Sequence, residues 1–435
     1  MEAILNAVMW LADNIFGEPA ILIGFIVLVG LLLQKKTLSQ TISGTFKAII
    51  GFLIITLGAD IISNALSVFE PLWAEVFNLE SESFSGYMGQ EEFNGRFGSA
   101  VALAMAIGFL INVIMARFTR FKYIYLTGHM MFWTTTIFAG VLVQVNENIS
   151  FWPLVIFLSV VMGLYWTLQP AVVQPYMRKV TGNDNIALGH TSAAAVLLSS
   201  WAGKLFGNKE QDSEKIKVPK NLEFLRDSNV ITALTMGILF LIGAIVVMLR
   251  DTPGAQELVA STDQNFLVYA IIQSFTFTAG IAVVLTGVRM FIGEIVPAFK
   301  GIATKLVPGA KPALDAPIVF TFAPNAVILG FLGAFIGGLF WLVILGNTVG
   351  YIFVPTMIVL FFHGATAGVF GNATGGARGA IIGGFITSTI VAWGQYVMVR
   401  MLISDTIPDT GMWAADTDMF LLGPIIRFIS QLLFG

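Results

Sequence analysis

The chain has 435 residues, of which 56% are hydrophobic and only 11% are charged, and its formal net charge is −3. A water-soluble protein of this length keeps about a quarter of its residues charged, so most of this surface must face an apolar medium. The sequence contains no cysteine, which excludes disulfides, thiolate metal sites and thiol nucleophiles. Its three histidines stand singly, which argues against a metal centre, and nothing indicates nucleic-acid binding.

Apolar segments long enough to cross a bilayer as helices recur from end to end. Alternating segments of about ten residues, which are typical of a β-barrel, are not seen. Glu2, Asp13 and Glu18 replace the basic start of a cleavable signal, so we expect the first helix to be retained. The sequence therefore predicts an all-α polytopic membrane protein with eleven transmembrane helices, at residues 19–33, 42–68, 98–116, 130–146, 151–171, 229–250, 266–288, 326–345, 351–370, 379–401 and 418–434.

The charges sort by sign along the connecting segments. Four acidic connections, at residues 70–92, Glu147, 251–263 and 405–418, alternate with five basic groups: Lys35 and Lys36; Arg117, Arg120 and Lys122; Arg178 and Lys179; the run from Lys204 to Arg226; and Arg289, Lys300, Lys305 and Lys311. Positively charged connections stay in the cytoplasm. This alternation predicts an amino terminus outside the cell and a carboxyl terminus in the cytoplasm.

Two apolar segments do not fit as complete spans. Residues 186–203 have basic segments on both sides, and residues 315–325 are too short to cross and contain Pro317 and Pro324. We interpret both as re-entrant hairpins. In transporters such broken segments usually line the substrate site, because their exposed backbone groups bind solute.

Polar residues in these segments are the candidate binding groups. His129 follows a glycine at the start of a span, and a second Gly-His pair, Gly189-His190, lies in the first hairpin. A neutral histidine offers one donor and one acceptor, which suits a hydroxyl-rich ligand, although an interfacial histidine is the alternative for His129. Asp315 opens the second hairpin and either binds solute hydroxyls or caps the following turn.

Four further residues carry weaker interpretations. Asn325 either caps the next helix or contacts solute, and Glu294 either supports the site or forms a local ion pair with Arg289. His363 lies on an apolar helical run and is interpreted as structural. Asp60 lies deep in a span without an evident partner, so the sequence does not place it in the site.

Two other segments have a composition that allows more than one interpretation. Residues 71–97 are acidic and aromatic, with Trp73, Phe77, Phe84 and Tyr87, and either return to the cavity or form an interfacial aromatic belt. Residues 371–376 are glycine-rich but lack the lysine of a phosphate-binding loop, so they favour close helix packing or a hinge over ATP binding.

Long strings in this sequence resemble the membrane component (EIIC) of the ascorbate-specific phosphotransferase system, within the ascorbate and galactitol permease family. The resemblance covers nearly the whole chain. It is densest at residues 35–52, 126–132 (LTGHMMF), 287–294 (GVRMFIGE), 306–315 (LVPGAKPALD) and 321–326 (TFAPNA).

The resemblance implies a single permease domain over residues 1–435, in which core and scaffold subdomains are interleaved and no soluble EIIA or EIIB domain is present. It implies a homodimer in the bacterial inner membrane that takes up L-ascorbate by an elevator-like motion. The solute is phosphorylated from a phosphocysteine on the separate EIIB partner, which EIIA serves. The permease itself then needs no catalytic residue, cofactor or metal.

The ligand contacts that the resemblance implies map onto ten residues, which are Gly86, Tyr87, His129, Met130, Met131, Phe132, Trp133, His190, Thr191 and Asp315. Two of these depart from the family pattern, which has glutamine at positions 133 and 191. An indole only donates and a threonine hydroxyl reaches less far than an amide, so the expected solute is L-ascorbate or a similar small polyhydroxylated molecule.

Two other classes of function are alternatives to a phosphotransferase permease. An ion-coupled or facilitative secondary transporter of a sugar-like solute would use Asp60, Glu294 and Asp315 as its proton or sodium groups. A solute-sensing receptor would need a soluble signalling domain, and the sequence shows none.

Overall fold

The computed structural model describes residues 19–77, 86–216, 224, 227–351, 353, 357–408 and 416–435. Its helices are α2 Pro19–Leu33, α3 Leu38–Phe77, α4 Gly89–Phe118, α5 Gly128–Val145, α6 Phe151–Thr181, α7 Ala193–Phe206, α8 Ser228–Met248, α9 Pro253–Ala260, α10 Phe266–Lys305, α11 Pro317–Phe320, α12 Pro324–Thr348, α13 Met357–Val397 and α15 Thr417–Phe434. Two short turns of other helix types, η2 Ser213–Lys215 and η4 Met398–Leu402, and three short strands, β1 Tyr123–Tyr125, β2 Ala187–Leu188 and β3 Lys311–Leu314, complete the list.

The predicted membrane helices are present. Within the described residues, nine helices are long and apolar enough to cross a membrane, judged by length and composition. The difference from the predicted eleven has two sources. The segment at 19–33 forms the shorter helix α2, and the segments at 351–370 and 379–401 correspond largely to the two parts of α13 and η4 on either side of the kink at Gly375 and Gly376. The chain is thus a multi-pass membrane protein.

Glycine accounts for the interruption inside α13. Gly375 and Gly376 leave the helical conformation, and Gly376 has φ +63°, which favours glycine. The chain after α7 fits into this break, where Asn208 N–H donates to Gly375 O (2.8 Å) and Ala377 N–H donates to Gln211 O (2.8 Å). The prediction of close packing or a hinge at residues 371–376 is confirmed as a close contact at a break in the helix.

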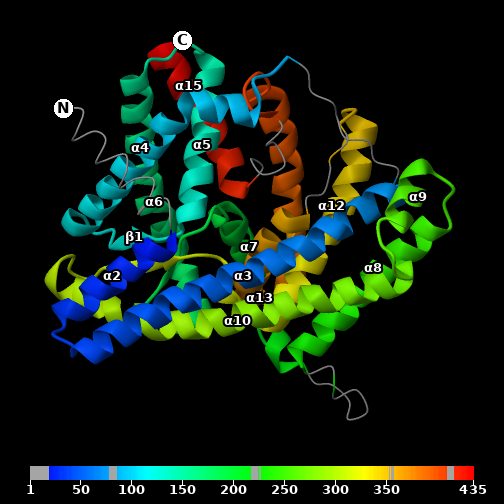
Figure 1. Cartoon of the computed structure of the whole chain (residues 1–435), viewed down its shortest axis with the longest axis horizontal. Coiled ribbons are helices and arrows are strands. Elements are labelled where there is room, and N and C mark those ends of the chain that lie inside the picture. Colours follow the sequence, from blue (N-terminus) through cyan, green and yellow to red (C-terminus); the bar gives the residue numbers. More distant parts are fainter. Residues whose placement is uncertain are drawn as a thin grey trace.

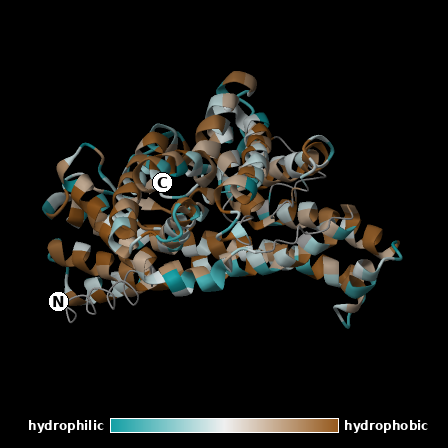
Figure 2. Cartoon of the chain, turned by 90° about the horizontal axis from the view of Figure 1, so that it is seen from above, coloured by the Kyte–Doolittle hydropathy of each residue, from teal (hydrophilic) through white to brown (hydrophobic). Residues whose placement is uncertain are grey.

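The helices form two layers. Figure 1 shows α3 and α10 running side by side across the molecule, and α2, α8 and α9 pack with them. The second layer contains α4 to α7, α12, α13 and α15, several of which stand upright in the same view. Turned by 90°, the helices of both layers show mostly hydrophobic residues (Figure 2). Large apolar side chains such as Phe25, Phe46 and Leu57 are more than 40% exposed, as expected for a lipid-facing surface.

Buried aromatic rings fill the space between the layers. Phe69 of α3 lies 5.7 Å from Phe335 of α12, and Phe277 of α10 lies 5.1 Å from Phe361 of α13, measured between ring centroids. Tilted and edge-to-face pairs at such distances add about 0.5–1.5 kcal/mol each beyond the area that they bury. The two layers are therefore joined in part by contacts between buried aromatic rings.

Four glycines hold α3 against α10. Gly51 and Gly58 of α3 meet Gly287 and Gly280 of α10 in antiparallel order. A Cβ added at Gly287 would lie 2.7 Å from the Ile55 nitrogen and 2.9 Å from the Gly51 oxygen, so the two backbones leave no room for a side chain. Small residues at such spacing allow membrane helices to approach closely.

The only strands among the described residues form a small parallel sheet in the order β1-β3-β2. The register pairs Tyr125 with Ala313, Ala187 with Ala313, and Leu188 with Leu314. Parallel strands need long crossover connections, which here are α5 with α6 and α7 with α8 to α10. The sheet adds to the predicted all-α fold a feature that the sequence analysis missed.

An asparagine completes the pairing at the open edge of this sheet. The buried Asn112 of α4 donates to Tyr123 O and accepts from Tyr125 N–H, both at 3.0 Å. Its amide also donates to Thr167 Oγ1 (2.9 Å) on α6. The side chain thus takes the place of a fourth strand and satisfies backbone groups that would otherwise be buried without partners.

Contacts at both ends tie segment 405–434 to the connection between α5 and α6. Asp405 lies beside Gln144, whose amide donates to its carboxylate (2.6 Å), and the last residues of α15 lie beside Asn146, which donates to Phe434 O (3.0 Å). Segment 405–434 therefore starts and ends beside the connection between α5 and α6. Helix α15 is long and apolar enough to cross a membrane, and the orientation of the two termini stays a prediction.

The two predicted hairpins have the irregular backbone expected of them. Residues 186–203 contain β2, a turn and most of α7, and residues 315–325 contain the single turn α11. Their re-entrant path through a bilayer and the sidedness of the connections remain predictions.

Asp184 ties the end of α6 to the start of β3. Its carboxylate accepts from Gln174 Nε2 (2.7 Å), Arg178 Nε (2.8 Å) and Lys311 Nζ. Partial burial opposes its ionisation, but these hydrogen bonds and the positive charges hold the pKa of the Asp184 carboxyl well below its usual range.

The first prediction concerns the packing of α3 on α10. Gly287→Ala should lower the melting temperature of the detergent-solubilised protein, because its methyl group meets backbone atoms that cannot move aside, and overpacking costs about 1–3 kcal/mol. Gly293→Ala on the same helix is the control, since nothing lies within 4 Å of the added Cβ. Equal melting temperatures for the two variants would contradict the close contact.

The second prediction concerns pH. The pKa of Asp184 is depressed in the folded protein, so its contribution to stability is present above the pKa of the unfolded state, about 3.9, and is lost as the pH falls further. The thermal stability of Asp184→Asn should be lower than that of the wild type near pH 7, and the difference should shrink towards pH 3. A difference that does not change with pH would show that the charge of Asp184 contributes nothing.

Candidate functional site

The ends of the three strands bring the main predicted site residues together. His129 follows β1 by four residues, His190 follows β2 by two, and Asp315 directly follows β3. Because the strands are parallel, their carboxyl ends meet at one edge of the sheet. Residues from three distant parts of the sequence therefore face one another, as expected from the paired Gly-His motifs and the broken segments.

Asp315 lies between the two histidines. His129 Nε2 is 3.5 Å from Asp315 Oδ2, and His190 Nε2 is 3.9 Å from Asp315 Oδ1. The His129 side chain is 46% exposed, whereas the side chains of His190 and Asp315 are 2% and 19% exposed. Asp315 Oδ1 also accepts from Ala316 N–H (2.7 Å), but Ala316 is the N-cap residue of α11 and no side chain caps that turn, so the position of Asp315 supports the cavity interpretation and not the cap.

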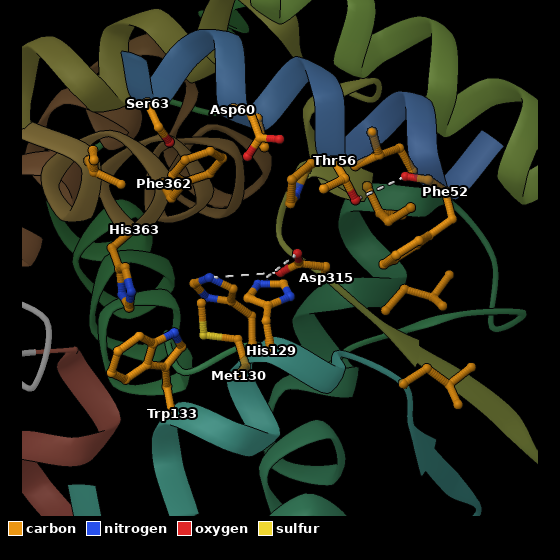
Figure 3. Close-up of a pocket in the computed structure, with 18 of the residues that line it drawn as sticks. Phe52, Thr56, Asp60, Ser63, His129, Met130, Trp133, Asp315, Phe362 and His363 are labelled. Atoms are coloured by element: carbon orange, nitrogen blue, oxygen red, sulfur yellow. Dashed lines mark hydrogen bonds and ion pairs between the residues drawn. The ribbon is translucent and has the colours of Figure 1, made fainter. Parts of the chain in front are cut away.

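These side chains line a cavity of about 450 Å³ between the two layers. Figure 3 shows Thr56, Asp60 and Ser63 projecting from α3 on one side, with Asp315, His129, Met130 and Trp133 facing them. Apolar side chains, among them Phe52, Ile318 and Phe362, fill most of the remaining wall. A mostly apolar pocket of about 300–1,000 Å³ with a few convergent polar groups is typical of a small-molecule site.

The start of α15 closes the far side of the site. Asp416 Oδ1 lies 3.1 Å from His363 Nε2, and Asp416 Oδ2 accepts from Thr191 Oγ1 (2.5 Å). The His363 ring lies 4.7 Å from the His190 ring, measured between centroids. All three histidines of the chain thus lie around one cavity, which His363 and Asp416 also line.

Asp418 fixes the first turn of α7 against this cluster. Its carboxylate accepts from Ala193 N–H (3.0 Å), Ala194 N–H (2.7 Å) and Tyr165 Oη (2.8 Å). A carboxylate at the amino end of a helix satisfies amides that lack partners within the helix and interacts favourably with the helix dipole. Asp418 therefore holds α15, α7 and α6 together behind His190.

The structure places the predicted residues of α5 on different faces. Met130 and Trp133 line the cavity with His129. Met131 is buried, and Phe132 is 36% exposed, and neither lines the cavity. This follows from the helical period, which puts residues three and four apart on one face. Thr191 lies behind the cavity wall, where its hydroxyl bonds Asp416.

Four other predicted residues lie outside the cavity. Gly86 and Tyr87 precede α4, where the next residues bond the backbone of Asp405 and Thr406. Glu294 pairs with Lys47 (3.9 Å) rather than serving the site. Asn325 donates to Ser213 O (3.2 Å), and its own N–H donates to Glu214.

The structure describes the aromatic segment at 71–97 only in part. Phe84 lies outside the described residues, and Trp73 packs in the aromatic contact between the layers, 5.0 Å from Phe335. Neither Trp73 nor Phe77 lines the cavity.

The sequence does not identify three ionisable residues of the cavity wall. It predicts a structural role for His363, does not place Asp60 in the site, and puts Asp416 in an acidic connection. Asp60 carried a usable signal, since an ionisable side chain inside a span is a candidate functional group. Asp416 carried no local signal, because only the fold brings it to His363.

Two comparisons with known proteins identify relatives of this chain. A family model described as the PTS system sugar-specific permease component (EIIC-GAT, where PTS is the phosphotransferase system) matches residues 14–420. The chain is also 29% identical over 419 residues to the ascorbate-specific PTS system EIIC component of Mycoplasma pneumoniae (strain ATCC 29342 / M129 / Subtype 1).

The match to the Mycoplasma protein covers 85% of this chain and 63% of the relative, so the chain spans a little under two thirds of the relative's length. The family model, in contrast, spans nearly the whole chain and supports the phosphotransferase interpretation rather than an ion-coupled transporter. The chain therefore belongs to the EIIC-GAT family of PTS sugar-specific permease components.

Proposed function

We propose that this chain is the membrane permease of a phosphoenolpyruvate-dependent phosphotransferase system, and that it takes up L-ascorbate or a similar small polyhydroxylated solute. The observation that carries this proposal is the meeting of His129, His190 and Asp315 at the ends of three parallel strands. The name of the Mycoplasma relative supports ascorbate as the first solute to test.

The donor and acceptor groups of the cavity suit a polyol. An ionised aspartate only accepts hydrogen bonds, and a neutral histidine donates one and accepts one. Asp315 therefore accepts hydrogen bonds from solute hydroxyl groups, while His129 and His190 donate to or accept from the solute oxygens. Phe52 and Trp133 supply apolar surface for the carbon skeleton of the solute.

The coupling step takes place on a partner protein. The chain contains no cysteine, and the donor in this proposal is a phosphocysteine on EIIB, which EIIA recharges. A solute hydroxyl oxygen attacks the phosphorus, the P–O bond forms as the S–P bond breaks, and the hydroxyl proton is released. The cavity residues of the permease orient the solute for this transfer, and the permease serves as the transport subunit of the phosphotransferase complex.

In this proposal the protein works as an elevator-type homodimer, and each of its two layers has one role. The layer of α2, α3 and α8 to α10 serves as the dimerising scaffold, and the layer that carries the strand ends serves as the moving core. The protein lies in a bacterial inner membrane with the basic connections in the cytoplasm, where EIIB docks.

The third prediction tests the coupling. Cells that express the chain with its EIIA and EIIB partners should accumulate radiolabelled L-ascorbate as a phosphate ester, and deletion of EIIB should abolish this accumulation. Uptake that persists without EIIB and collapses with a protonophore would show a secondary transporter instead.

The fourth prediction tests the site. His190→Ala and Asp315→Ala should each weaken the binding of labelled L-ascorbate to purified protein by about tenfold to a hundredfold, as expected for a lost hydrogen bond to a charged or buried group. Glu294→Ala is the control, because Glu294 lies outside the cavity and should leave affinity unchanged. Wild-type affinity in either site variant would place the solute elsewhere.

A further inference from the structure

The pair His363–Asp416 has one polar atom without a partner. His363 is 2% exposed and lines the cavity. Its Nε2 faces Asp416 Oδ1 at 3.1 Å, but its Nδ1 is buried without a hydrogen-bond partner among the described residues. A buried nitrogen left in this way costs free energy unless a bound molecule satisfies it.

Asp416 determines which ring nitrogen of His363 carries the proton. Both carboxylate oxygens act as acceptors, Oδ1 from His363 and Oδ2 from Thr191 Oγ1. The His363 proton is therefore on Nε2, and in the neutral ring Nδ1 is left with a free lone pair. The carboxylate holds the ring in one orientation, as a second residue does behind many ligand-binding histidines.

The His363 ring is part of the cavity wall. Figure 3 shows His363 extending into the cavity on the side of Trp133, away from Asp60. His190 packs against the His363 ring at 4.7 Å, but its Nδ1 is occupied by Ser192 Oγ (3.0 Å) and its Nε2 faces Asp315. No hydrogen bond joins His190 to His363 Nδ1, and His190 Nε2 faces the side of the cavity where Asp315 lies.

We propose that His363 is a solute-binding residue whose Nδ1 accepts a hydrogen bond from one hydroxyl group of the transported solute, and that Asp416 is the positioning residue that presents it. This inference rests on the proposed function, because it assumes a polyhydroxylated solute in this cavity. It assigns to His363 a contact separate from those of Asp315 and His129, on another wall of the cavity. A solute that lacks a donor at this position leaves the nitrogen unsatisfied and binds more weakly.

The variant His363→Gln separates binding from structure. The glutamine amide reaches the position of Nε2 and keeps the donor to Asp416, but it places no acceptor where Nδ1 stands. We expect unchanged folding by thermal melting and about tenfold weaker binding of labelled L-ascorbate, the cost of one unmatched buried hydrogen bond. A purely structural His363 would give a variant that binds as the wild type does.

A set of L-ascorbate analogues, each lacking or methylated at one hydroxyl, identifies the partner of His363. For one analogue the wild type should lose about tenfold in affinity, and the wild type and His363→Gln should then bind that analogue equally. If His363→Gln loses the same factor against every analogue, the contact does not exist and the inference is wrong.

Nitrogen-15 NMR of histidine-labelled wild-type protein gives a readout that needs no variant, since the chain has only three histidines. The His363 signals should show a neutral ring protonated at Nε2, and its Nδ1 signal should move to lower frequency when L-ascorbate is added. A proton on Nδ1, or an Nδ1 signal that does not move at saturating L-ascorbate, overturns the inference. Wild-type protein that binds none of the analogues would instead overturn the proposed function, along with the contact that rests on it.

Discussion

Peptide groups that leave a helix inside an apolar layer must find hydrogen-bond partners within the protein, and this constraint organises the centre of the molecule. Three short strands satisfy one another, and the Asn112 side chain satisfies the strand at the open edge. Since the strands are parallel, the same pairing that removes unsatisfied backbone groups also gathers His129, His190 and Asp315. The arrangement of these three side chains is thus a consequence of the strand pairing that satisfies the backbone hydrogen bonds.

Most of the helical framework could be predicted because long apolar runs identify membrane helices without any knowledge of their neighbours. Residues 19–33 form α2 with the predicted bounds, and 151–171 lie within the longer α6. The sheet could not be predicted in this way, because strands of two to four residues are too short to show an alternating pattern. The contact that brings the end of α15 beside Asn146 could not be predicted either, because it joins residues 288 positions apart in the sequence.

The candidate site was predictable where its residues belonged to broken segments, and not where they belonged to regular helices. Gly-His pairs and prolines pointed to His129, His190 and Asp315. His363 lies on an unbroken part of α13, and Asp416 precedes α15, so neither carried a local signal that distinguished binding from packing. What defines them is their contact across more than fifty residues of chain, which a single sequence does not reveal.

The carboxylate of Asp418 has a consequence for selectivity. The first turn of a helix inside a membrane protein usually attracts anions, and transporters often use it to hold a negatively charged cargo. In this chain the amides of Ala193 and Ala194 are already occupied by an internal negative charge. These two amides are therefore not available to bind a negatively charged solute, and recognition of the solute depends on the polar side chains around the cavity.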